Sequence, residues 1–148
     1  MVRHATDLVR GFAEERGSTL ELTLARELPP VLMNQVEIEQ VIINLVENAV
    51  QAGARRIILR TESVDDLVRV AIQDDGSGIT QENRQHLFDP FYTTRYQKGG
   101  SGLGLSIAHG IVADHGGAID LESEVGTGTT MTISLPRAGD SDGQGSGI

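Results

Sequence analysis

Polar and apolar residues recur along the chain with two periods, and each period predicts one kind of secondary structure. Residues 3–15, 34–54 and 102–117 repeat apolar side chains every three or four positions, as amphipathic or buried helices do. A shorter capped helix is expected at 80–88. Alternation in steps of two predicts strands in five segments: 19–25, 56–62, 67–74, 118–124 and 129–136.

The order of these elements predicts the fold class. The strands within 56–74 and within 118–136 follow each other across short turns, so each pair reads as a hairpin. Long helices and about five strands, arranged this way, predict an α+β two-layer sandwich. A doubly wound parallel sheet would need regular strand-helix alternation, which the pattern lacks. For the helix at 34–54, Asn34 is the expected N-cap, with Glu37 three residues on, and Gly53 the expected stop.

Composition and charge narrow the classes of function. The 148 residues are 39% apolar and 22% charged, which suits one globular domain with a stable core. A net charge of −9 argues against broad binding to nucleic acid or anionic membranes, so a phosphate ligand would need local donors. The absence of cysteine excludes disulfides and thiolate metal sites. With neither a secretory signal nor a membrane-length apolar run, a cytoplasmic location is expected, and the Gly/Ser/Asp-rich residues 137–148 predict a disordered tail.

Two amides, Asn44 and Asn48, stand four residues apart in a helix that is otherwise apolar. Asn48 falls about 20° beyond the edge of the apolar arc and Asn44 about 40° further round, with Gln51 close by. A half-buried amide oxygen suits a hard cation such as Mg²⁺, but an edge amide can equally bond solvent or a loop. The apolar arc covers about 200° and contains Ile38, Val41, Ile42, Ile43, Leu45, Val46, Ala49, Val50 and Ala52.

The first glycine cluster, "DDGSGI" at 74–79, follows a predicted strand. Asp74 stands at the strand end, where a carboxylate can accept from an exocyclic amine such as N6 of adenine. Gly76 and Gly78 allow positive φ and a close approach of the backbone to a flat ligand. An Asp-Gly turn without any ligand explains this motif equally well when it is taken alone.

The second cluster, "GGSGLGLSI" at 99–107, leads directly into a predicted helix. Glycines with free backbone N–H groups at a helix start form an anion site. The cluster is neither a dinucleotide fingerprint, because Leu105 replaces the third glycine, nor a Walker A loop. Between the clusters, Phe88 and Phe91 could anchor a lid from which Arg95 and Lys98 reach a polyphosphate. A third motif, "VGTGTT" at 125–130, reads alone as a hairpin turn.

Read in order, these motifs resemble the catalytic ATP-binding domain of bacterial sensor histidine kinases, in the wider family of gyrase-type topoisomerases, heat-shock chaperones and MutL proteins. "NLVENAVQA" is similar to the N box and "DDGSGI" to the G1 box of that family. "FDPFYTTR" is similar to its F box, "GGSGLGLSI" to its G2 box and "GTGTT" to its last glycine box. The forms that the N box and the F box take here are most similar to those of the nitrogen-regulation and oxygen-sensing branch of these kinases. The resemblance implies a Bergerat-type fold, with a mixed sheet of about five strands covered on one face by helices.

Carried over motif by motif, the resemblance implies a site for ATP and Mg²⁺. Asn48 would hold the metal, Asn44 would orient the triphosphate, and Asp74 would bind the adenine amine. Arg95 and Lys98 join the two amides as implied catalytic groups. Gly78 would line the adenine slot, three glycines of the second cluster would contact the phosphates, and Thr129 would lie near the base. The residues implied in cofactor binding besides those already named are Gln51, Gly76, Gly78, Ile79, Phe88, Phe91, Thr93, Thr94, Gly100, Ser101, Gly102, Leu103, Gly104, Leu105 and Thr129.

One position departs from the hydrolysing relatives. Four residues before the metal-binding amide, those relatives carry a Glu that activates water, and here that place is Asn44. Without such a base, transfer to a protein side chain is favoured over hydrolysis. Glu47 is one position out and faces elsewhere by helical geometry.

The sequence lacks a histidine in the context of the family's phosphoacceptor motif. None of His4, His86, His109 and His115 is followed by Glu. We therefore expect residues 1–17 to end a phosphoacceptor hairpin or linker helix, 18–136 to be the catalytic domain, and the acceptor to lie in a separate dimerisation domain of the same kinase. A response regulator would be an indirect partner, the isolated domain a monomer and the parent a homodimer, without nucleic-acid or direct membrane contact. Two alternatives remain open: a non-catalytic nucleotide-dependent module and a hydrolysing ATPase.

Overall fold

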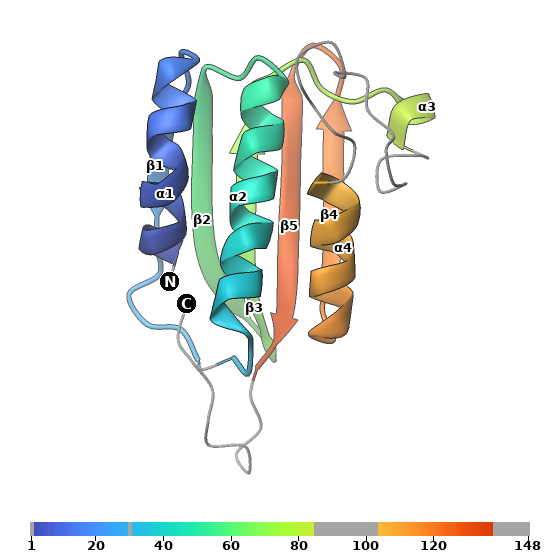
Figure 1. Ribbon diagram of the computed structural model, residues 1–148. Helices are drawn as coiled ribbons and strands as arrows, with labels where there is room; N and C mark the ends of the chain where they lie inside the picture. The colour runs from blue at the N-terminus through green and yellow to red at the C-terminus, as the bar shows by residue number, and fades with distance from the viewer. Residues whose placement is uncertain (1, 30, 85–103, 138–148) are drawn as a thin grey trace.

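A computed structural model describes residues 2–29, 31–84 and 104–137 and arranges them in two layers (Figure 1). Helices α1, α2 and α4 lie side by side on one face of a single sheet, which confirms the predicted α+β sandwich. The helices are α1 (Val2–Glu15), α2 (Gln35–Gln51), the short α3 (Gln81–Arg84) and α4 (Gly104–Asp114). The strands are β1 (Thr19–Thr23), β2 (Arg56–Val64), β3 (Leu67–Asp74), β4 (Ala118–Glu124) and β5 (Gly128–Pro136).

The sheet is mixed, and its strand order is β1-β2-β3-β5-β4. β1 runs parallel to β2, and all the other neighbours are antiparallel. β2–β3 and β4–β5 are the two predicted hairpins, and the first turns at Asp65, a non-glycine residue with φ of 54°. The long-range pairing of β3 with β5 joins the two hairpins. It places Asp74, the last residue of β3, opposite Thr129 of β5.

The ends of α2 follow the predicted capping signals. The Asn34 side chain accepts a hydrogen bond from the Glu37 backbone N–H at 3.1 Å. At the other end, Gly53 has φ of 81°, and the Ala54 N–H bonds the Ala49 carbonyl at 3.3 Å. Together with the bond from the Gly53 N–H to the Val50 carbonyl at 3.0 Å, it forms a Schellman motif, in which glycine supplies the left-handed residue that stops the helix.

The core lies between the helical layer and the sheet and includes α1. Ala5, Val9 and Ala13 of α1 are buried there together with side chains of α2 and β1. The expected boundary at residue 17 therefore does not coincide with a gap in the packing, because α1 shares the core of the domain. That α1 also continues a phosphoacceptor hairpin stays a prediction. The largest fully buried side chains are Ile38, Ile42, Leu45, Ile57, Leu59, Ile133, Leu135, Val31, Val41, Val46 and Val68.

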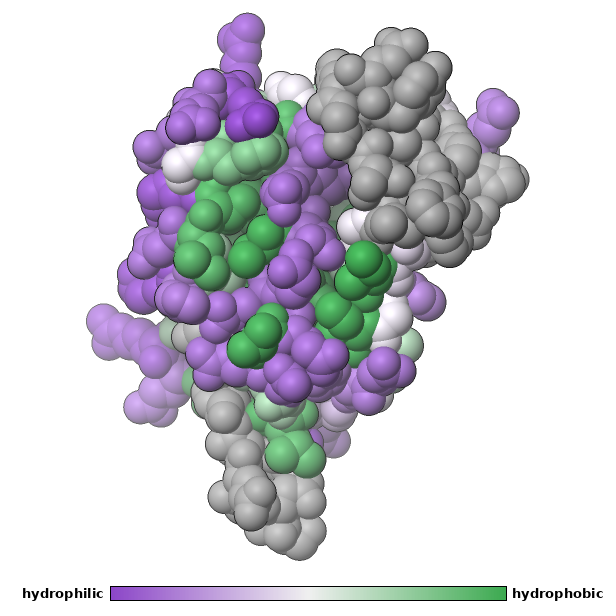
Figure 2. Space-filling view, in the orientation of Figure 1, coloured by the Kyte–Doolittle hydropathy of each residue, from purple (hydrophilic) through white to green (hydrophobic). Residues whose placement is uncertain are grey.

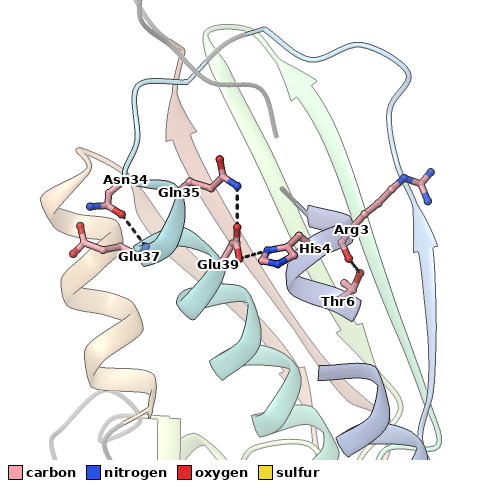
Figure 3. A network of polar contacts seen from close by, with 7 residues as sticks. All are labelled: Arg3, His4, Thr6, Asn34, Gln35, Glu37 and Glu39. Carbon is pink, nitrogen blue, oxygen red and sulfur yellow. Dashed lines mark hydrogen bonds and ion pairs between the residues drawn. The ribbon is translucent and has the colours of Figure 1, made fainter. Parts of the chain in front are cut away.

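A buried carboxylate also joins α1 to α2 (Figure 3). Glu39 on α2 is 7% exposed, and its Oε2 lies 2.7 Å from Nδ1 of His4 on α1. Gln35, one turn earlier, donates from Nε2 to Glu39 Oε1 at 3.0 Å. The hydrogen bond from Gln35 and then the contact with His4 lower the pKa of Glu39, while burial opposes them. The His4 side chain is 63% exposed, yet it contributes a contact between two helices.

The outer face of the helical layer is mainly polar (Figure 2). Hydrophilic side chains run down the middle of this view, and apolar groups form separate patches over α1 and α4. Among the described residues, no helix is long and apolar enough to cross a bilayer. The large apolar side chains that remain exposed in this part of the chain are Leu8, Leu32, Val36, Ile107 and Val125.

Candidate functional site

Three segments meet at the upper end of the sandwich in Figure 1: the C-terminal end of α2, the loop after β3 and the β4–β5 turn. The start of α4 lies lower, beside the middle of α2. Backbone bonds join the first three segments. The Ser77 N–H donates to the Ala52 carbonyl at the end of α2 (3.1 Å), and the Gly126 N–H of the β4–β5 turn donates to the Ser77 carbonyl (2.9 Å). The sequence motifs carried by these segments are therefore neighbours in space.

Asn44 connects the amide edge of α2 to the glycine-led start of α4. Its Nδ2 donates to the Gly104 carbonyl at 3.0 Å, and its Oδ1 accepts from Gln40 Nε2 at 2.7 Å. A Cβ at Gly104 would lie 3.9 Å from Asn44 Cβ and Cγ, an ordinary van der Waals distance, so this contact does not itself require a glycine. Asn44 therefore contacts the backbone at the start of α4 and positions this end of the helix.

Asn48 and Gln51 continue the same edge and, like Asn44, are half-buried, as the helical geometry predicts. From Asn44 to Ala52 the helix rises about 12 Å. The described residues contain no group of three His, Cys, Asp or Glu side chains able to hold a metal. An ion at Asn48 would thus need phosphate oxygens and waters to complete its shell, which is the coordination typical of Mg²⁺.

The two adjacent aspartates after β3 have different surroundings. Asp74 is 8% exposed at the end of a central strand, and its Oδ1 accepts from the Gly76 N–H at 2.8 Å. Asp75 is exposed and points back to β2, where its Oδ1 accepts from the backbone N–H groups of Arg55 (2.8 Å) and Arg56 (3.0 Å). The bond from Arg56 is the largest cause that lowers the pKa of Asp75. Asp75 therefore fastens the start of β2, and Asp74 remains the candidate ligand.

Positive φ was expected at Gly76 and Gly78 and is found only at Gly78, while the approach of a flat ligand to this backbone stays a prediction. Gly76 does not have positive φ, and a Cβ there would lie 2.9 Å from the Ala52 carbonyl oxygen. Gly78 has φ of +77°, and its Cβ would lie 2.3 Å from the Glu124 carbonyl oxygen. Both glycines are required by the close approach of the protein's own backbone. Gly128, in the motif read as a plain turn, is equally constrained, since its Cβ would lie 2.1 Å from the Asp74 carbonyl oxygen.

Thr129 was predicted to lie near the base, but its hydroxyl partner Ser123, on the neighbouring strand, was missed by the sequence analysis. Ser123 Oγ and Thr129 Oγ1 lie 2.8 Å apart, and Ser123 Oγ also accepts from the Ile79 N–H at 2.8 Å and donates to the Gly128 carbonyl at 3.1 Å. Thr129 is 5% exposed. The available signal was periodicity, because Ser123 is a polar residue in the alternating register otherwise occupied by Ile119 and Leu121.

Two other predicted site residues are partly explained by packing. Ile79 is 7% exposed and belongs to the core, and Leu105 packs against the same core from the first turn of α4. Glu47, to which no role was assigned, is half-buried on α2, and burial raises its pKa while Arg16 opposes the shift. The remaining predicted site residues lie outside the described part of the chain: Phe88, Phe91, Thr93, Thr94, Arg95, Lys98, Gly100, Ser101, Gly102 and Leu103.

Comparisons with known proteins agree with this geometry. The family described as "Histidine kinase-, DNA gyrase B-, and HSP90-like ATPase" matches residues 33–139. The sensor histidine kinase ZraS of Escherichia coli (strain K12) is 36% identical over 92% of this chain and 29% of its own length. The sensor protein FixL of Bradyrhizobium diazoefficiens is 34% identical over 93% of this chain and 28% of its own length.

Solved structures of histidine kinases are also similar to this chain. The catalytic domain of histidine kinase ThkA superposes with a TM-score of 0.80 at 32% identity, covering 92% of this chain and 90% of that one. Full-length ShkA in complex with AMPPNP gives a TM-score of 0.81 at 28% identity, over 92% of this chain and 29% of that one.

The chain therefore belongs to the family of histidine kinase-, DNA gyrase B- and HSP90-like ATPases. Within that family it is the ATP-binding catalytic domain of a sensor histidine kinase, similar to ZraS and FixL. It spans less than a third of the length of these two curated relatives.

Proposed function

We propose that this domain binds Mg-ATP at the upper end of the sandwich and transfers the γ-phosphoryl group to a histidine on a separate dimerisation domain of the same kinase. A response regulator would receive the group afterwards, and the domain would work in the cytoplasm. The observation that supports the proposal most is the 3.0 Å bond from Asn44 Nδ2 to the Gly104 carbonyl, since it joins the amide edge to the α4 start.

The roles follow from the chemistry of each group. Asp74 accepts from the adenine amine at the buried strand end, beside Thr129. The first turn of α4 directs backbone N–H groups and the positive end of its dipole toward the phosphates. Asn48 would hold Mg²⁺ by its amide oxygen, and a bound ion would supply neutralisation of charge on the phosphate oxygens.

Transfer rather than hydrolysis fits the side chain at position 44. An amide has no basic atom with which to take a proton from water, and both ends of this amide already bond Gln40 and Gly104. In this proposal the nucleophile is the acceptor histidine, whose ring nitrogen attacks the γ-phosphorus as the bond from that phosphorus to the β–γ bridging oxygen breaks.

Asn48→Ala tests the metal site. We expect at least about a tenfold loss of ATP affinity measured by calorimetry in excess Mg²⁺, because the ion loses its protein ligand. Gln35→Ala is the matched control, since it removes an amide from the opposite end of the same helix. Unchanged ATP affinity in Asn48→Ala would refute the metal assignment.

The transfer itself is tested with labelled ATP and an added phosphoacceptor domain. The expected label appears on the acceptor histidine and on none of the chain's own histidines. Steady release of phosphate by the chain alone would instead support a hydrolysing ATPase.

A further inference from the structure

Gln40 lies on α2 four residues before Asn44 and belongs to none of the motifs found in the sequence. Its side chain is exposed, and its Nε2 donates to Asn44 Oδ1 at 2.7 Å. The same Asn44 amide donates from Nδ2 to the carbonyl of Gly104, the first residue of α4, at 3.0 Å. A chain of two hydrogen bonds therefore runs from the surface of α2, through Asn44, to the start of α4.

The Gly104 carbonyl determines which way both amides face. A backbone carbonyl can only accept, so the Asn44 atom that lies 3.0 Å from it has to be the nitrogen. The Asn44 oxygen then faces Gln40, which has to present its own nitrogen, because two amide oxygens 2.7 Å apart would repel each other. One backbone group thus fixes the orientation of two side chains.

This orientation decides what Asn44 offers to an anion at the α4 start. An amide nitrogen carries two N–H groups, and the bond to Gly104 uses one of them. The second N–H is on the same side of the amide as the helix start and can donate to a phosphate oxygen. An amide rotated by half a turn would instead direct its oxygen at the Gly104 carbonyl and at the phosphate, and both would repel it.

We propose that Gln40 is a positioning residue for the phosphate end of the site: by donating to the Asn44 oxygen, it keeps the Asn44 N–H groups directed at the α4 start and at the phosphates. The inference rests on the proposed function, in which the triphosphate lies between α2 and the start of α4. Gln40 acts through Asn44 and needs no contact with the nucleotide.

A purely structural role for Gln40 leads to a different expectation. Two amides four residues apart on an exposed helix surface ordinarily add little to stability, and most substitutions there are tolerated. Under that reading, the hydrogen-bonding chemistry of a new side chain at position 40 has no particular effect. The positioning role predicts that a donor at position 40 preserves the site and that an acceptor of the same shape disrupts it.

Three variants separate the two readings. Gln40→Glu has the same shape but can only accept when ionised, so it opposes the Asn44 oxygen. Gln40→Ala removes the partner, and Gln40→Lys keeps a donor of similar reach. Val36→Glu is the matched control for charge, because Val36 is 77% exposed one turn earlier on the same helix and a glutamate there adds a negative charge away from Asn44.

The first measurement is made without nucleotide, by hydrogen exchange at the Ala108 amide. In an α-helix that begins at Gly104, the Ala108 N–H donates to the Gly104 carbonyl, so its exchange reports opening of the first turn. We expect exchange about two- to fivefold faster in Gln40→Ala, about tenfold faster in Gln40→Glu, and unchanged in Gln40→Lys and Val36→Glu.

The second measurement compares dissociation constants of ATP, inorganic triphosphate and adenosine, with Mg²⁺, at about 0.1 M and about 0.5 M salt. Gln40→Ala should weaken ATP and triphosphate about two- to fivefold, and Gln40→Glu about tenfold, while adenosine affinity stays unchanged. Added salt should remove any effect of Val36→Glu, because it screens exposed charge, and should leave most of the loss in Gln40→Glu.

The outcomes distinguish the inference from the proposed function. Equal exchange at Ala108 in the Glu and Lys variants, an unchanged triphosphate affinity in Gln40→Glu, or an equal loss for adenosine and triphosphate overturns the inference. ATP binding by the wild type keeps the proposed function in each of these cases. Failure of the wild type to bind ATP overturns both.

Discussion

Gly78 and Gly128 hold the candidate adenine end of the site together by having no side chain. The Gly128 α-carbon faces the Asp74 carbonyl, and Gly78 faces the carbonyl of Glu124 at the end of β4. Any Cβ at either position would enter space occupied by backbone, which cannot shift without moving a strand. These glycines therefore fix Asp74 and the β4–β5 turn relative to each other before any ligand is present.

Gly78→Ala should destabilise the domain strongly. We expect the free energy of unfolding to fall by about 2–4 kcal/mol, because the variant combines positive φ with a backbone clash. Gly110→Ala is the matched control, since nothing lies within 4 Å of its Cβ position inside α4. There the better helix former should raise stability by up to about 1 kcal/mol. Urea unfolding measures both, and a Gly78→Ala variant as stable as the wild type would contradict the packing account.

Neighbouring residues of one type also show what sequence can assign at this scale. Asp74 was identified as the ligand candidate from its strand-end position; the structure buries it opposite Thr129, and its role as a ligand stays a prediction. The competing carboxylate of Asp75 is occupied by the backbone at the start of β2, nineteen residues back along the chain. No local pattern reveals that bond, because it depends on where the β2–β3 hairpin returns.

At the scale of elements, α4 is fastened to α2 at both of its described ends. Asn44 bonds the Gly104 carbonyl at the first turn. At the other end, the Asn34 backbone N–H donates to His115 Nε2 at 3.0 Å, and His115 Nδ1 lies 2.8 Å from the Ile111 carbonyl. Since Nε2 accepts, the proton of the neutral ring is on Nδ1. The two contacts fix α4 along α2 and so fix the α4 start relative to Asn48.

The contact between His115 and Asn34 predicts the tautomer of His115 and a loss of stability when the His115 side chain is removed. ¹⁵N chemical shifts of the ring should show the proton of the neutral form on Nδ1. His115→Ala should lower the free energy of unfolding by about 1 kcal/mol or more, because the N-cap N–H loses its acceptor. His109→Ala, at an exposed position of the same helix, is the comparison and should cost less. A neutral ring protonated on Nε2 would contradict the contact in which Nε2 accepts from the Asn34 N–H.

The capping of α2 shows where element-level prediction succeeds and where it stops. The Asn34 side chain and Gly53 were predicted as the helix ends, and both act as predicted because caps are made by adjacent residues. The acceptor for the Asn34 N–H is instead His115, which is 81 residues away. A bond of that kind exists only after two helices have packed together.

At the scale of the whole molecule, the described residues form one two-layer unit with a shared core. α1 contributes Val9 to that core, and its His4 reaches the buried Glu39 of α2. α1 precedes the strand that was expected to begin the domain, yet it packs as an integral part of the helical layer. A movement of α1 would therefore displace contacts of α2, the helix that carries Asn44 and Asn48.

Val9→Ala measures this integration. The free energy of unfolding should fall by about 1–2 kcal/mol, because a core side chain is truncated. Leu8→Ala, at the adjacent position that is 60% exposed, should change it by less than about 0.5 kcal/mol. Circular dichroism and hydrogen exchange at β-sheet amides should report the same loss. Sheet amides with unchanged protection in Val9→Ala would indicate that α1 unfolds separately.

The sequence by itself determined the type and order of the elements, the ends of α2, the apolar face of each element and the identity of the motifs. Each of these depends on residues close together in the chain, so periodicity and capping chemistry are sufficient. Only the tertiary structure decided that β3 pairs with β5, that Ser123, Thr129 and Asp74 lie opposite one another on three neighbouring strands, and that α1 belongs to the core. Those features depend on burying every apolar face at once, and that condition is met by segments far apart in sequence.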